Sequence, residues 1–126
     1  MSLPIPIEEF PMLVAVVQIP RSGPKPDKAA AVARAQDSAK IYREVKGLIS
    51  KQYLNGEEGG GGIYTFESRE TAEAWFNDEW WGWIEERFGA RPTLTMYDHY
   101  VTVDNTAGVV RVDGEPVADG SAEAAE

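Results

Sequence analysis

Two side chains of this sequence are candidates for proton transfer and anion stabilisation in a protein cavity. His99, the only histidine, lies in the segment TMYDHYVTV, and the unperturbed pKa of histidine is close to neutral pH. Lys51 lies in GLISKQYL, and an ammonium group removed from water stabilises a bound anion strongly. We therefore predict that Lys51 and His99 are catalytic, the lysine holding a substrate anion and the histidine relaying a proton.

Aromatic residues alternate with these two side chains along the same segments. Alternate residues of a strand share one face of a sheet, so we expect these sets to point together, away from the helices, into one cavity. For the last strand the opposite parity, with Met96 and Tyr100 facing the cavity, stays open. An apolar pocket with a few polar groups suits a planar aromatic ligand, and a dry, filled dimer core is the alternative. The predicted ligand-binding residues are Tyr53, Tyr64, Phe66 and Tyr97.

The sequence indicates no metal or cofactor. It has no cysteine, which excludes disulfides and thiolate sites, and one histidine beside Asp98 is a poor ligand set for a metal ion. Haem, which needs only one proximal histidine, is an alternative that no other feature supports. The run Gly59–Gly62 lacks the Lys-Ser/Thr of a phosphate-binding loop. No Ser-His-Asp order, Cys-His pair or carboxylate dyad indicates hydrolysis.

The elements that must position these residues form a strand–helix–strand pattern that occurs twice. The second copy contains an aromatic helix, which Ser68 and Gly89 are suited to begin and end. The pattern predicts an α+β fold, a ferredoxin-like βαββαβ sandwich with one sheet and both helices on one of its faces. The predicted elements are strand Met12–Ile19, a helix from about Asp27 to Val45, strand Gly47–Leu54, strand Gly61–Phe66, the helix between Ser68 and Gly89, and strand Thr93–Val103.

Segments outside this pattern are predicted to be irregular. Residues 1–112 form one domain that begins with an extended arm of eleven residues, and Val109–Val112 is suited to a short extra strand. Residues 113–126 hold five acids and no base, which predicts a disordered acidic tail. Four consecutive glycines at Gly59–Gly62 indicate either a mobile loop tip that gates the pocket or a close approach of two backbones.

The composition of the sequence argues against some classes of binding partner. The 126 residues carry a net charge of −9, which argues against nucleic acid, because phosphate binding needs a basic surface. No apolar stretch approaches the ~20 residues of a membrane-spanning helix. The first residues, MSLPIPIEEFP, lack the basic and apolar regions of a signal peptide. We therefore expect a cytoplasmic protein that binds neither nucleic acid nor membrane.

Several local patterns resemble one known family. The strand start VKGLI, the alternating Lys51 and Tyr53, the glycine pair before Ile-Tyr-x-Phe in GGIYTFES, and the helical AEAW are similar to the YdhR-like monooxygenases of the dimeric α/β-barrel superfamily. The resemblance covers about residues 12–104, and the glycine pair before Ile63 is its most characteristic part. It supports Tyr64 and Phe66 as pocket residues.

This resemblance implies a homodimer in which two sheets pack face to face and enclose a pocket in each half. It also implies a cofactor-independent monooxygenase that acts on a small aromatic metabolite such as a quinol or polyphenol. Such a substrate is easily oxidised, so the protein would need only to remove a proton and stabilise the anion. The alternative is a non-catalytic dimeric module that binds a small ligand, as in a stress response, because a fold does not fix chemistry.

Overall fold

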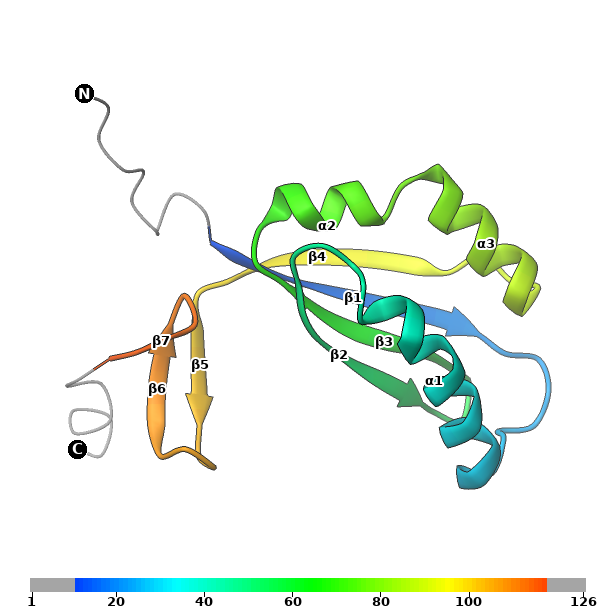
Figure 1. Ribbon diagram of the computed structural model, residues 1–126. Helices are drawn as coiled ribbons and strands as arrows, with labels where there is room; N and C mark the ends of the chain where they lie inside the picture. Colours follow the sequence, from blue (N-terminus) through cyan, green and yellow to red (C-terminus); the bar gives the residue numbers. More distant parts are fainter. Residues whose placement is uncertain (1–10, 118–126) are drawn as a thin grey trace.

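The computed structural model describes residues 11–117. The fold is α+β, with a four-stranded antiparallel sheet in the order β2-β3-β1-β4 and three helices on one face of that sheet (Figure 1). This order is compatible with the predicted ferredoxin-like sandwich. The elements are β1 (Met12–Pro20), α1 (Lys28–Tyr42), β2 (Leu48–Asn55), β3 (Gly59–Phe66), α2 (Arg69–Trp75), α3 (Asp78–Phe88), β4 (Thr93–His99), β5 (Val101–Asp104), β6 (Val109–Val112) and β7 (Glu115–Pro116).

Strand β1 is central, as its long apolar run predicts, because it pairs with both β3 and β4. Leu13, Ala15 and Val17 point toward the helices and are buried. The residues between them, Val14 and Val16, lie on the opposite face and are only half-buried. The core therefore fills one side of the sheet, and within residues 11–117 no element covers the other side (Figure 1).

Helix α1 packs on the sheet through small side chains. It begins after Asp27, whose carboxylate accepts a hydrogen bond of 2.8 Å from the Ala30 backbone N–H. Ser38 and Tyr42 are the buried residues of this helix. Val32, nearer the start of the helix, is exposed.

The single aromatic helix expected between Ser68 and Gly89 is two helices. Ser68 begins α2 and Gly89, with φ of 69°, ends α3, as predicted. Between the two helices, Phe76 leaves the helical conformation with ψ of 54°. Asn77 then begins α3 by accepting a hydrogen bond of 3.0 Å from the Trp80 backbone N–H. This break directs α2 and α3 along different parts of the sheet (Figure 1).

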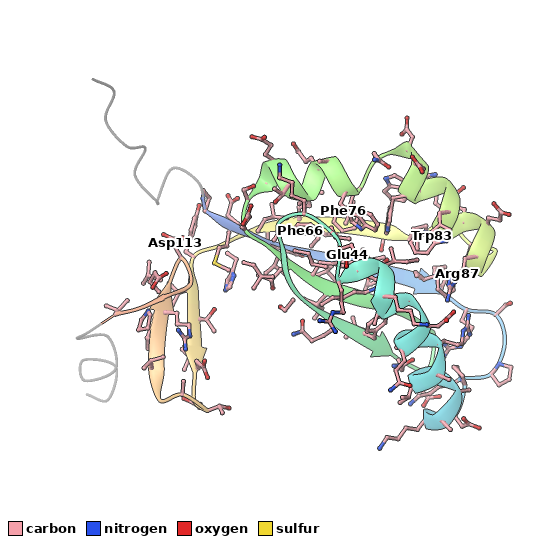
Figure 2. All side chains as sticks on the ribbon, in the orientation of Figure 1. Glu44, Phe66, Phe76, Trp83, Arg87 and Asp113 are labelled. Atoms are coloured by element: carbon pink, nitrogen blue, oxygen red, sulfur yellow. The ribbon has the colours of Figure 1, made fainter. Side chains whose placement is uncertain are left out.

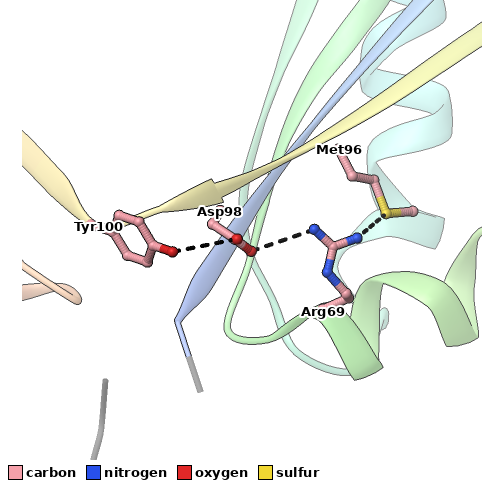
Figure 3. A network of polar contacts seen from close by, with 4 residues as sticks. All are labelled: Arg69, Met96, Asp98 and Tyr100. Carbon is pink, nitrogen blue, oxygen red and sulfur yellow. Dashed lines mark hydrogen bonds and ion pairs between the residues drawn. The ribbon is translucent and has the colours of Figure 1, made fainter. Parts of the chain in front are cut away.

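A network of polar contacts joins α2 to the far end of β4 (Figure 3). The guanidinium of Arg69 lies 3.4 Å from a carboxylate oxygen of Asp98 and 3.7 Å from the sulfur of Met96. The hydroxyl of Tyr100 donates to the other oxygen of Asp98 at 3.4 Å. Met96 and Asp98 therefore point toward the helices, and Tyr97 and His99 point to the opposite face.

The glycine run is a strand and not a loop tip, so the mobile-tip prediction is wrong. Gly59 to Gly62 pair with β1, and Gly60 to Gly62 also pair with β2. A side chain would not fit at Gly61, where φ is 148° and a methyl group would meet the carbonyl oxygen of Val17 at 1.9 Å. The other expectation, close backbone approach, explains the glycine there. The loop tip is instead Gly56 to Glu58.

A second, three-stranded sheet follows the first (Figure 1). The predicted last strand breaks at Tyr100, and β5, β6 and β7 pair in order as an antiparallel sheet. The expected extra strand at Val109–Val112 is confirmed as β6. The tail predicted to begin at residue 113 is corrected for residues 113–117, because Glu115–Pro116 forms β7. Residues 118–126 and most of the predicted N-terminal arm, residues 1–10, lie outside the described residues.

Candidate functional site

A cavity of about 530 Å³ lies between α1, α3 and the strands β1, β2 and β3. Its floor is formed by Lys51, Tyr53 and Tyr64 of the sheet, and α1 contributes Tyr42. The space exists because Gly60 and Gly61 of β3 line it without side chains, and alanines of α1 line the opposite wall. The cavity is thus on the helix-covered side of the sheet and is formed within a single chain.

Lys51 reaches this cavity from β2 across a glycine. Its strand position is opposite Tyr64 of β3. A methyl group at Gly62 would come within 3.0 Å of Lys51 Cε, so the glycine leaves room for the lysine stem. A β-bulge between Leu48 and Ser50 decides which side chains of β2 point toward the helices. Because of it, Ile49 and Lys51 do not share a face although they are two residues apart, and Ile49 is exposed.

The amine of Lys51 is surrounded by tyrosine rings. The Nζ atom lies 3.4 Å from the ring centre of Tyr42, 4.0 Å from that of Tyr53 and 4.8 Å from that of Tyr64. Within residues 11–117, the amine makes no ion pair. Three ring faces thus take the place of the carboxylate that a buried ammonium usually needs.

Burial lowers the pKa of Lys51 to about 7, and the positive charge of Arg87 acts in the same direction. The tyrosine rings act in the opposite direction, because their negative faces favour the ammonium form. Since the amine titrates near neutral pH, it can accept a proton as a neutral amine and then hold an anion as an ammonium ion. Both states are accessible at physiological pH.

The hydroxyl groups of Tyr42 and Tyr64 stay protonated and help to orient the rings of the cavity. Burial raises the pKa of Tyr64 and of Tyr42, so neither phenol acts as a base near neutral pH. The hydroxyls of Tyr42 and Tyr64 lie 3.2 Å apart, and that of Tyr53 lies 2.8 Å from Ser38 Oγ. These two contacts connect the cavity floor, which the sheet forms, to α1, and they hold the aromatic rings around Lys51 in place.

Three of the predicted site residues come together in the cavity, and three do not. Lys51, Tyr53 and Tyr64 line it, but they point toward the helices and not away from them, so the predicted direction was wrong. Phe66 shares their face but is fully buried in the core. Phe66 pairs with Leu13 of β1, and both side chains point toward the helices. A large apolar side chain buries the most surface in that position.

Tyr97 and His99 lie on the opposite face of the sheet, so the predicted cavity shared by Lys51 and His99 is not formed. Tyr97 is exposed, whereas the His99 ring contacts strand β5, with Nε2 2.7 Å from Thr102 Oγ1. Tyr97 and His99 do point away from the helices, as predicted, so the alternative parity is not found: Met96 points toward the helices and packs against the core without lining the cavity. Tyr100 follows β4 and is exposed.

Sequence reasoning missed the residues that the helices contribute. Tyr42 of α1 is not among the predicted ligand-binding residues, although it is the ring closest to the amine of Lys51. Arg34 of α1 and Arg87 of α3 also line the cavity. Figure 2 shows Trp83 and Arg87 on the side of α3 that faces α1. The signal that would have found these residues is the small-residue face of α1, because such a face leaves space beside a sheet.

Comparisons with known proteins add no assignment. Neither models of protein families nor curated proteins match this chain. Among residues 11–117, no group of three or more histidine, aspartate and glutamate side chains is placed to hold a metal ion. No helix in that range is long and apolar enough to cross a membrane. The chemistry of the site must therefore be argued from the cavity itself.

Proposed function

We propose that this protein is an enzyme that binds a small phenolic compound, such as a quinol or polyphenol, in the cavity and removes its phenolic proton. The observation that carries this proposal is the amine of Lys51, enclosed by three tyrosine rings and with its pKa lowered to about 7. A base is most effective when its pKa lies near the working pH. The aromatic walls suit a planar ring.

Lys51 performs two steps in this proposal. As the neutral amine it takes the proton of the phenol, which leaves a phenolate and an ammonium ion side by side. The ammonium then stabilises the phenolate at short range, and a bound aromatic ring that displaces water from the cavity strengthens this interaction. Tyr53 and Tyr64 line the same floor, and their hydroxyls, paired with Ser38 and Tyr42, hold the rings in place around the substrate and Lys51.

The reaction class that fits this arrangement is cofactor-independent monooxygenation. An electron-rich phenolate can transfer electrons to O₂ directly. Where the ring carries a CH₂ group activated by the phenolate, that carbon forms a hydroperoxide with O₂. Loss of water then leaves a carbonyl, so that one oxygen atom enters the product and the other leaves as water. The protein supplies orientation, proton removal and anion stabilisation for these steps.

The proposed enzyme acts as a homodimer through the uncovered face of the main sheet. Val14, Val16 and Ile63 on this face are half-buried, and Tyr97 is exposed. Soluble proteins rarely leave a continuous apolar sheet face in water, and a second copy of the same face covers it by two-fold symmetry. The cavity lies on the other side of the sheet, so dimerisation leaves it accessible from the helices.

The test is oxygen consumption with a panel of quinols and polyphenols. We expect turnover that increases with pH through about pH 7, as the Lys51 amine becomes neutral. Lys51→Met keeps the bulk of the stem and removes the amine, so it should lower the rate about 100-fold or more. Lys40→Met, a change of an exposed lysine on α1, is the matched control and should leave the rate unchanged.

A non-catalytic ligand-binding protein is the second candidate, because the cavity walls are tied together by hydrogen bonds and need no reaction to explain them. It predicts saturable binding of the same phenols with no oxygen uptake at any pH. Equal turnover by the wild type and by Lys51→Met would refute the assignment of Lys51. Failure of every phenol to bind would refute both candidates.

A further inference from the structure

All charged side chains that line the cavity are basic. They are Arg21, which follows β1, Arg34 of α1, Lys51 of β2 and Arg87 of α3. The whole chain has 12 basic and 21 acidic residues. If four residues were drawn at random from all the charged residues of the chain, all four would be basic only about one time in 80. The charge of the cavity lining therefore differs from that of the acidic chain as a whole. This local positive charge favours an anion.

Two of these cations contact the same aromatic ring at the rim. The guanidinium carbons of Arg34 and of Arg87 each lie 5.7 Å from the ring centre of Phe88, so one ring holds both. Within residues 11–117 neither arginine has an acidic side chain within ion-pair distance. Both are exposed, unlike the floor of the cavity. Their positive charges are therefore available to a ligand at the rim.

The other two cations have different roles. Arg21 donates hydrogen bonds to the carbonyl oxygens of Gly56 and Glu57, so it holds the tip of the β2–β3 hairpin and is already occupied. Lys51 lies at the floor under three rings. Arg87 is close enough to Lys51 to act on its charge, and no carboxylate lines the cavity between them. An anion that entered the cavity would relieve this repulsion.

We propose that the natural ligand is a phenol that also carries a permanent oxyanion group, which Arg34 and Arg87 hold at the rim while the phenol points to Lys51. This deepens the function proposed above and rests on it. Arginine suits the rim because its planar guanidinium can bind a carboxylate or phosphate through two parallel hydrogen bonds. The aromatic body of such a ligand fills the space between the rim and the tyrosine floor.

The test uses two probes of the same shape, 6-hydroxy-2-naphthoate and 6-hydroxy-2-naphthamide, which differ in the charge at one end. Calorimetry with the wild-type protein should give at least about 10-fold tighter binding of the carboxylate, with a preference that falls as salt is added. The double change Arg34→Gln with Arg87→Gln should remove the preference. Lys40→Gln on the same helix is the control and should keep it. Arg87→Lys retains the charge and should keep part of the preference.

The outcomes separate this inference from the proposed function. If both probes bind equally to the wild type, the inference is overturned while the phenol site stands. If the carboxylate preference survives the double change in a protein whose circular dichroism is unaltered, the anion is held elsewhere and the inference is also overturned. If neither probe binds although some quinol or polyphenol does, the inference is overturned and the phenol site stands; if no phenol binds, both are refuted.

Discussion

Replacement of Lys51 by methionine should make the protein more stable, and the gain should depend on pH. The pKa of this lysine falls from 10.5 to about 7 on folding, so the unfolded chain binds the proton more tightly than the folded one. Stability therefore increases with pH between these two values, and the full destabilisation is present below pH 7. At 1.36 kcal/mol for each pH unit, the difference corresponds to about 5 kcal/mol.

The measurable part of this energy is smaller for two reasons. At pH 9 the unfolded lysine is still mostly protonated, so about half of the effect is recovered between pH 6 and pH 9. The three tyrosine rings also favour the ammonium form and reduce the shift, by an amount on the order of 1 kcal/mol. We therefore expect the wild type to gain about 2 kcal/mol relative to Lys51→Met between pH 6 and pH 9.

Urea unfolding of both proteins at a fixed protomer concentration measures this difference, because other titrating groups cancel between them. Lys40→Met is the control, and its stability difference from the wild type should stay constant with pH, since this lysine is exposed. If the wild type and Lys51→Met keep a constant difference from pH 6 to pH 9, the Lys51 amine is solvated in the folded protein. The reasoning about the cavity and its base would then be refuted.

Two further predictions concern the sheet. Gly61→Ala should destabilise the protein by more than about 3 kcal/mol or prevent folding, because the methyl group would meet the Val17 carbonyl oxygen at 1.9 Å; Gly82→Ala, in open space on α3, is the control and should stabilise by up to about 1 kcal/mol in urea unfolding. Val16→Lys, on the uncovered face, should convert the proposed dimer to a monomer near 13.9 kDa in sedimentation at micromolar concentration, and a wild type that is already monomeric would refute the dimer.

The order of the main elements could be predicted from the sequence because each has a strong local signal. The apolar run at Met12, the caps Ser68 and Gly89, and the valines of β6 all mark elements that the structure contains. The break at Asn77 was missed, although asparagine is itself a good helix N-cap, because the apolar spacing continues across it. A local capping preference decided the structure there.

The face to which the site residues point could not be predicted, because both faces of the sheet carry apolar residues. Alternation along β3 separates Tyr64 from Ile63, but it does not say which of them meets the helices. In β2 the bulge after Leu48 also shifts the alternation, so that residues two apart on either side of it point to different faces. A prediction from strict alternation cannot include such a shift. The parity of β4 was an arbitrary choice for the same reason, and the arrangement of Asp98 with Arg69 decided it.

The helices hold the information that the strands lack. A helix that packs through alanine and serine approaches the sheet closely, so large rings must fill the space that its small side chains leave. Tyr53, which contacts Ser38, and Tyr64, which contacts Tyr42, fill that space from the sheet. Gly60 and Gly61 do not fill it, and the cavity is what remains. A well-packed core would place a leucine where Lys51 stands and would be more stable for it. The Lys51 amine lowers the stability of the fold near neutral pH, and it lies at the floor of a cavity with basic side chains at its rim. A destabilising ionisable group in such a place is typical of a functional site, where the requirements of function oppose those of stability.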